Sequence, residues 1–227
     1  MFWAIVNNQR IEPKPKTYGK CPLCNEKVVS KCGQIKVWHW AHLNSSNCDP
    51  WHEQETYWHL HWKLTFGKEN SEIIIKKNKK WHIADIFNKQ KIVIELQNSP
   101  IQKEVINQRE EFYGEKMIWL VNGSKFKNNF YIKDFDDNSH WWFNKHDNTK
   151  TKKGKKIFKW EYPRRSWENL QRNVFIDFGD NQLFWVKTGM GTSSGTGLFI
   201  HKEKFIEKYE GNYDYYIEKL SNKKNYC

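Results

Sequence analysis

The chain lacks any apolar run long enough to cross a membrane, and residues 1–6 lack the length and the charge order of a signal peptide. Because of these two absences we expect a cytoplasmic protein that makes no membrane contact. The chain also shows no internal repeat. Its five cysteines are then expected to be reduced thiols rather than disulfides, because the cytoplasm keeps thiols reduced.

Two common catalytic motifs are missing as well. The pair His52-Glu53 is followed by Thr56 where a zincin H-E-x-x-H motif has its second histidine. The glycine-rich residues 189–197 have no lysine at the position that a Walker phosphate-binding loop requires. The first absence excludes a zinc peptidase of that class, and the second predicts a flexible loop rather than a phosphate cradle.

Acidic residues are outnumbered, because Lys and Arg total 38 while Asp and Glu total 26, which gives a net charge of +12. An excess of this size predicts a polyanionic partner, and we expect nucleic acid. Tryptophans recur along the chain, although most tryptophans in proteins pack in cores rather than stack on bases. The composition thus indicates nucleic-acid binding without identifying the surface that binds.

The residue pattern predicts an α+β fold in four parts. The first part holds four of the cysteines and too few apolar residues to fold alone, so we expect a metal to support it. The second is predicted to form a helix, three strands, a helix and a strand. The parts are an N-terminal zinc-binding module at 1–50, a core at 51–123, a basic polar linker at 124–156 and a C-terminal α+β accessory region at 157–227.

The core elements follow from apolar spacing and from capping residues. A helix is expected from residue 51 onward. A second helix is expected to begin with Ser99 as its cap, to use Gln102 in a capping box and to stop at Gly114. Strands are expected at residues 72–76, 81–87, 92–97 and 117–121.

A group of thiols and imidazoles lies in the first part. Cys21 and Cys24 are separated by two residues, His39 and His42 follow with the same spacing, and Cys48 lies close by. Paired thiolates with imidazoles available suit tetrahedral zinc. Four protein ligands close the shell, so this zinc is expected to be structural. Which two of His39, His42 and Cys48 complete the site stays open, with a preference for the two histidines.

Two carboxylates and an amide interrupt strands that should be apolar. Asp85 lies in the strand at 81–87, and Glu95 and Gln97 lie in the strand at 92–97. An ionised carboxylate in such a run is costly unless a cation compensates it. Because side chains alternate along a strand, an odd-numbered hairpin loop places Asp85 diagonally across from Glu95 on one face. We therefore expect a divalent metal at Asp85 and Glu95.

Glu55, His59 and Lys63 recur at every fourth residue, which places them on one face of the first predicted helix. This row is either an exposed polar face or a set of side chains that projects into the metal site. In the second case Glu55 adds a carboxylate, while His59 or Lys63 orients a phosphate or stabilises charge. Arg109 and Tyr113 have the same spacing on the second helix, where packing and phosphate contact are the alternatives.

Taken together, these residues resemble the competence protein CoiA-like family, whose nuclease core is similar to the PD-(D/E)XK superfamily. The resemblance covers roughly residues 20–121, and its motifs are specific in their joint order rather than singly. The matching segments are Cys21-Pro-Leu-Cys24, His39-Trp-Ala-His42, Cys48-Asp-Pro-Trp51, Glu55-Thr-Tyr-Trp-His59 with Lys63, Ile83-Ala-Asp85-Ile, Ile94-Glu95-Leu-Gln97-x-Ser99, and Arg109 with Tyr113.

The resemblance implies a restriction-endonuclease-like core with the order αβββαβ, which is also the order predicted above. It implies a nuclease in which Asp85 and Glu95 bind Mg²⁺ or Mn²⁺ and Glu55 assists. Gln97 stands where the family motif has lysine, and an amide cannot act as a general base. Gln97 is therefore expected to orient the attacking water, and Lys63 is a candidate for the missing positive charge.

DNA is the partner that the resemblance implies, and other DNA-processing proteins are further candidates. The lysine-rich linker is expected to contact the DNA backbone without reading its sequence. The lysines assigned to this contact are Lys152, Lys153, Lys155 and Lys156.

Two alternatives stay open. A His-Asn-His nuclease would place its chemistry at His39, His52 or His59, although the single C-x2-C pair weighs against that class. A zinc-stabilised DNA-binding or DNA-processing scaffold would use the acidic residues for structure alone, and it would bind DNA without cutting it.

Overall fold

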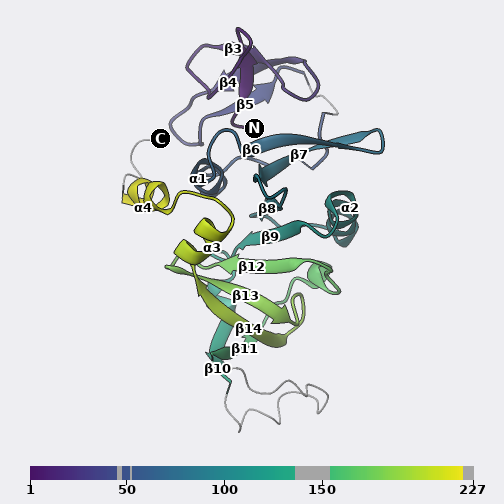
Figure 1. The fold of residues 1–227 in the computed structure, drawn as a ribbon, viewed down its shortest axis with the longest axis vertical. Helices are drawn as coiled ribbons and strands as arrows, with labels where there is room; N and C mark the ends of the chain where they lie inside the picture. The colour runs from purple at the N-terminus through teal and green to yellow at the C-terminus, as the bar shows by residue number, and fades with distance from the viewer. Residues whose placement is uncertain (45–47, 52, 136–153, 222–227) are drawn as a thin grey trace. The chain divides into compact units, whose positions relative to one another are not determined.

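The computed structural model describes residues 1–44, 48–51, 53–135 and 154–221 (Figure 1). The chain forms two compact units, one of Met1–Glu95 with Ile206–Cys227 and one of Leu96–Phe205. Each unit contains both strands and helices, so the predicted α+β class is observed. No helix in the described ranges is long and apolar enough to cross a membrane.

The first unit begins with a five-stranded antiparallel sheet. Asn7 and Asn8 form its first tight turn with positive φ angles of 49° and 62°, a conformation that asparagine adopts more readily than most residues. Few buried apolar side chains fill this sheet, among them Val28 and Trp40. Its strands, in sheet order, are β2 (Gln9–Ile11), β1 (Ala4–Val6), β3 (Tyr18–Lys20), β4 (Lys27–Lys31) and β5 (His39–His42).

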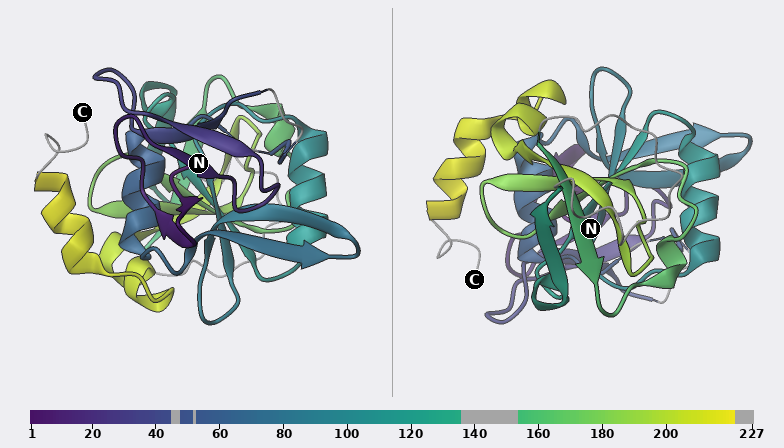
Figure 2. Two further views of the ribbon diagram at one scale, coloured as in Figure 1. Left: turned by 90° about the horizontal axis from the view of Figure 1, so that it is seen from above. Right: turned by 90° about the horizontal axis from the view of Figure 1, so that it is seen from below.

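The rest of the first unit combines two helices with antiparallel strands. Helix α1 (Tyr57–Thr65) packs against α4 (Tyr213–Ser221), and the Tyr57 hydroxyl donates to the carbonyl oxygen of Lys219 at 3.2 Å. Figure 2 shows the hairpin that follows α1 as a long blue ribbon. The strands after α1 are β6 (Ser71–Lys77), β7 (Lys80–Phe87) and β8 (Val93–Gln97), and the chain passes into the second unit within β8.

Helix α1 begins later than apolar spacing predicts. Residues 53–56 precede it without helical structure. The Thr56 hydroxyl caps the helix by accepting a hydrogen bond from the backbone N of His59 at 3.3 Å. Glu55 therefore lies before the helix, and the predicted helical row holds only for His59 and Lys63.

The second unit contains a sheet whose neighbouring strands are antiparallel except for the parallel pair β9 and β12. Aromatic side chains fill its core, and the rings of Phe130 and Phe158 stack with centroids 4.6 Å apart. In sheet order its strands are β9 (Met117–Asn122), β12 (Asn173–Asp177), β13 (Gln182–Thr188), β14 (Ser194–His201), β11 (Lys155–Trp160) and β10 (Phe130–Asp134). Its helical segments are α2 (Lys103–Tyr113), the 3-10 turns η1 (Lys127–Asn129) and η3 (Arg165–Trp167), and the start of α3 (Lys202–Lys208).

The predicted order of helix, three strands, helix and strand is observed as α1, β6, β7, β8, α2 and β9. Helix α2 ends at Tyr113 with Gly114 as its C-cap at a φ of 80°, as predicted. Its start differs, because Gln102 rather than Ser99 is the N-cap. Gln102 has an extended backbone, with φ at −77° and ψ at 149°, so the helix begins only at the residue after it.

Two segments expected to be loops contain strands. Strand β10 lies inside the predicted linker at 124–156, where lysines and asparagines obscure the alternation of buried and exposed residues. Strand β14 begins within the glycine-rich segment. A Cβ on Gly195 would lie 2.7 Å from the Phe158 ring, and one on Gly197 would lie 2.3 Å from the Phe184 ring. These glycines permit close packing rather than flexibility.

Candidate metal and nuclease-like sites

The first candidate site is centred on Lys63 of α1, whose side chain is only 5% exposed. Its Nζ donates to both carboxylate oxygens of Glu55 at 3.2 and 3.0 Å, and to Oε1 of Glu72 at 3.0 Å. It also lies 3.1 Å from Oδ1 of Asp85. One buried ammonium group thus meets three carboxylates, an arrangement in which the opposite charges offset the cost of removing each from water.

Asp85 and Glu95 lie on neighbouring antiparallel strands. In β7 and β8, Ile86 pairs with Ile94 and Phe87 pairs with Val93. The same register, extended by one residue, places Asp85 directly opposite Glu95. The backbone N of Asp85 donates to Oε1 of Glu95 at 3.4 Å. The two residues share a face as expected, but they are direct partners rather than diagonal neighbours because β8 begins at Val93.

The four carboxylates differ in their access to solvent. The Asp85 side chain is 21% exposed, whereas those of Glu55 and Glu72 are 1% and 5% exposed. Glu95 is buried as well. Asp85 is therefore the carboxylate of this cluster that an ion arriving from solvent meets first.

Burial and charge together set the protonation of this cluster. Burial lowers the pKa of Lys63, but Glu55, Glu72 and Asp85 outweigh it and hold that pKa well above 10.5. Burial raises the pKa of Glu55, with Lys63 opposing the change only in part. Burial acts on Glu72 in the same direction, but Lys63 and two backbone N–H groups hold the pKa of Glu72 below its usual range. Lys63 therefore stays charged, with Glu72 as its ionised partner.

Glu72 belongs to the cluster although the sequence predictions do not include it. Besides Lys63, its carboxylate binds the backbone N of Phe2 at 2.7 Å and that of Trp3 at 3.0 Å. It lies at the start of β6 with a φ of 49°, which is uncommon for a residue other than glycine. A glutamate that precedes three isoleucines is the same buried-charge signal that identified Asp85 and Glu95, and it could have identified Glu72.

Two other predicted residues of this site have different surroundings. The Nδ1 atom of His59 lies 2.8 Å from the Thr56 hydroxyl oxygen, and its Nε2 lies 4.0 Å from a carboxylate oxygen of Glu53. Gln97 belongs to the second unit, where it is fully buried and its Nε2 donates to the carbonyl oxygen of Ser99 at 2.9 Å. The water-orienting role of Gln97 stays a prediction.

Arg109 and Tyr113 lie on α2 in the second unit. Arg109 is 4% exposed, and its guanidinium carbon lies 5.9 Å from the centre of the Trp119 ring. The Tyr113 ring meets Phe112 edge to face at 5.1 Å. These contacts favour packing for both residues, and phosphate contact stays a prediction.

The predicted DNA-contacting lysines fall partly on a strand. Lys155 and Lys156 lie in β11 rather than in a loop, and Lys156 forms an ion pair with Asp134. Lys152 and Lys153 lie outside the described residues, as does His52 of the His-Asn-His alternative.

A second candidate site combines three thiols and an imidazole. Cys21, Cys24, His42 and Cys48 each place a ligand atom within 4.8 Å of the others. The Sγ atoms of Cys21 and Cys48 are 3.6 Å apart, and Sγ of Cys24 lies 3.2 Å from Nε2 of His42. Burial and the neighbouring thiols raise the pKa of Cys48. A bound cation would lower this pKa again, because it stabilises the thiolate. These four residues could bind a metal such as zinc.

The structure places Cys48 in this group instead of His39, the ligand that the sequence favoured. His39 and His42 are three residues apart on β5, so their side chains leave opposite faces of the strand. The Nδ1 atom of His39 lies 2.8 Å from the carbonyl oxygen of Val37. A spacing of two residues between histidines suits a loop or a helix but not an extended strand.

The two candidate sites are joined through Asp49, the residue after the last thiol of the group. Its carboxylate accepts a hydrogen bond from the backbone N of Ile83 at 2.8 Å and lies 3.0 Å from Nδ1 of His82. The His82 ring stacks on Trp51 with centroids 3.3 Å apart and planes at 12°. The thiol group is thus tied to β7, the strand that carries Asp85.

We expect Cys48→Ser to lose stoichiometric zinc and His39→Ala to retain it, because only Cys48 lies among the other thiols. Zinc content of the purified full chain, measured by atomic emission, distinguishes the two variants. Cys32→Ser is the matched control, since this thiol lies outside the group. Retention of zinc by Cys48→Ser together with its loss from His39→Ala would reverse the assignment.

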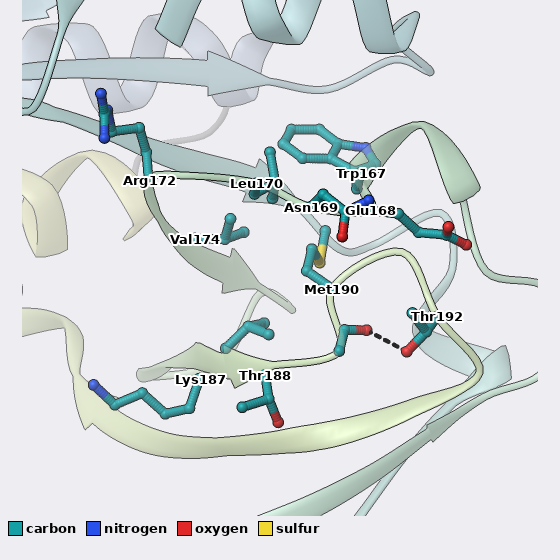
Figure 3. A pocket seen from close by; sticks show the side chains of 12 residues that line it. Trp167, Glu168, Asn169, Leu170, Arg172, Val174, Lys187, Thr188, Met190 and Thr192 are labelled. Carbon is teal, nitrogen blue, oxygen red and sulfur yellow. Dashed lines mark hydrogen bonds between the residues drawn. The ribbon is translucent and has the colours of Figure 1, made fainter.

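A pocket of about 310 Å³ lies within the second unit, where the segment after η3 meets β12 and β13 (Figure 3). Trp167, Val174 and Met190 supply apolar parts of its wall. The Thr192 hydroxyl in the wall already donates to the carbonyl oxygen of Gly189 at 2.9 Å. The pocket contains none of the residues predicted from the sequence, and we assign it no chemistry.

Carboxylates from β6, from β7 and from the segment before α1 meet at Lys63, and a separate group combines thiols with an imidazole. The fold is that of an α+β protein, and the comparison with family models places it in a nuclease-like class. Residues 62–170 match the family model described as competence protein CoiA, nuclease-like domain, and residues 7–50 match the one described as competence protein CoiA, N-terminal domain. The chain belongs to the competence protein CoiA family, which confirms the resemblance found in the sequence. No curated protein and no solved structure matches the chain.

Proposed function

We propose that this protein is a metal-dependent nuclease that hydrolyses phosphodiester bonds in DNA. The observation that carries the proposal is the pairing of Asp85 and Glu95 on one face of β7 and β8, with Asp85 open to solvent. A net charge of +12 suits a polyanionic substrate. The nuclease-like family model supports the same class of activity.

The donor atoms fit Mg²⁺ or Mn²⁺, because the cluster offers carboxylate oxygens and such hard cations prefer oxygen ligands. In this proposal Asp85 and Glu95 hold the ion. Glu55 and Glu72 are bonded to Lys63 and are at most 5% exposed, whereas Asp85 is 21% exposed, so in this proposal the two glutamates assist through the lysine. Zinc at the thiol group is structural, since four protein ligands leave no open position for substrate.

The chain's own residues orient the reacting groups. Lys63 holds Oδ1 of Asp85 at 3.1 Å, and Glu55 and Glu72 hold Lys63 in turn, so the Asp85 carboxylate is fixed before substrate arrives. A bound Mg²⁺ or Mn²⁺ would supply Lewis acidity toward the scissile phosphate and acidify water. Gln97, two residues along β8 from Glu95, is proposed to orient the attacking water by hydrogen bonding.

Cleavage of labelled single-stranded and double-stranded DNA tests this function directly. We expect products when Mg²⁺ or Mn²⁺ is present and none when divalent ions are omitted. Omission is preferable to strong chelators, because a chelator would also remove zinc from the thiol group. A protein that binds DNA equally well with and without these ions, and never cuts it, would instead be the non-catalytic scaffold.

A further inference from the structure

The hairpin of β6 and β7 has a basic tip outside the carboxylate cluster. Its residues 76–81 have the sequence Lys-Lys-Asn-Lys-Lys-Trp, and all six are exposed. Asn78 and Lys79 have φ angles of 49° and 61°, which is typical of a two-residue turn between twisted strands. Trp81 is 50% exposed, which is unusual for so large an apolar side chain.

The charges at this tip repel one another and therefore disfavour the folded hairpin. Lys77 lies directly opposite Lys80, and Lys76 lies opposite Trp81. Like charges at directly paired positions destabilise an antiparallel hairpin. Within the described part of the chain, no carboxylate forms an ion pair with Lys76, Lys79 or Lys80. A polyanion bound at the tip would relieve this repulsion.

Strand β7 connects the tip with the candidate nuclease-like site. Trp81 and Asp85 are four residues apart on β7, so alternation places both on one face, and Lys76 shares that face through its pairing with Trp81. At about 3.3 Å per residue, Trp81 lies roughly 13 Å along the strand from Asp85.

We propose that residues 76–81 form a docking surface for single-stranded DNA, in which Trp81 stacks on an unpaired base and the lysines contact phosphates. Duplex DNA offers the lysines the same phosphates, but its bases present no free face to an indole. The choice of DNA rests on the proposed function. The binding itself requires neither a divalent ion nor cleavage.

Fluorescence anisotropy of a labelled single-stranded oligonucleotide and of its duplex, without divalent ions, tests the docking surface. Trp81→Ala is expected to weaken single-strand binding by on the order of tenfold and to leave duplex binding nearly unchanged, because stacking is lost. Trp81→Phe should recover most of the loss. The triple variant Lys76→Gln/Lys79→Gln/Lys80→Gln should reduce the slope of log affinity against log salt by about 2.

The first unit offers matched controls. Lys14→Gln/Lys16→Gln/Lys20→Gln removes the same charge from exposed positions near the N-terminal sheet, and Tyr18→Ala removes an aromatic side chain that is 54% exposed. The docking surface is refuted if the wild type does not bind single strands, if Trp81→Ala binds them as the wild type does, or if the controls lose as much affinity. DNA binding through Trp81 without any cleavage would refute the nuclease instead and leave the docking surface intact.

Discussion

Asp85→Asn is expected to reduce metal-dependent DNA cleavage by roughly a thousandfold, an effect of the size seen when a group that stabilises transition-state charge is removed. The amide keeps the shape of the side chain but loses the negative charge that would hold the ion. Asp85 is also the most exposed carboxylate of the cluster, so the substitution removes the carboxylate that an ion arriving from solvent meets first. The single-turnover cleavage rate with Mg²⁺ and excess protein measures the effect.

The fold is expected to survive this change, because Lys63 keeps two ionised or hydrogen-bonding partners in Glu55 and Glu72. Circular dichroism and the thermal unfolding midpoint check this point. Asp214→Asn is the matched control, since it makes the same substitution at an exposed position of α4. Binding of Mn²⁺ by calorimetry gives a second readout, independent of cleavage, and it should weaken only in Asp85→Asn. Wild-type cleavage by a folded Asp85→Asn protein would exclude Asp85 from the reaction.

The two site residues that lie on β7 and β8 are predictable from the sequence for an energetic reason. A charged residue in an apolar strand needs compensation, and the residue pattern alone therefore identifies Asp85 and Glu95. An odd-numbered hairpin loop predicts their shared face, but the pairing differs by two residues from the predicted one, because Asp85 lies directly opposite Glu95 rather than diagonally across from it. Glu72 carries the same signal less clearly, because it stands at the start of its strand rather than inside it.

Features that depend on single local bonds or on tertiary contact are not predictable in this way. The start of α1 is set by one hydroxyl of Thr56, which apolar periodicity does not report. The selection of Cys48 over His39 depends on β5 being a strand, because the spacing of the histidines carries no information on which face each one leaves. Gly195 and Gly197 look like a flexible loop in sequence, and only the rings beside them show that they are packed.

Lys63→Met is expected to lower the free energy of unfolding by about 3–5 kcal/mol, the cost of leaving buried carboxylates without their cation. Methionine fills a similar volume, so the loss reports charge rather than a cavity. Urea unfolding of the full chain at neutral pH measures it, and Lys204→Met at an exposed position of α3 is the control, expected within about 0.5 kcal/mol of the wild type. Adding Glu55→Gln and Glu72→Gln to Lys63→Met should restore part of the loss.

The pH dependence of this difference follows from the two charges that face each other. The pKa of Lys63 is raised above 10.5 in the folded state, so its contribution is complete below that pH and is lost only as the pH rises beyond it. The pKa of Glu72 is lowered from 4.5, so its contribution is present above that pH and is lost as the pH falls through the lowered value.

In Lys63→Met the carboxylates have no cation and can take up protons instead. The stability difference should therefore be largest at neutral pH and shrink below pH 4.5, and a difference that grows on acidification would contradict the ion-pair assignment.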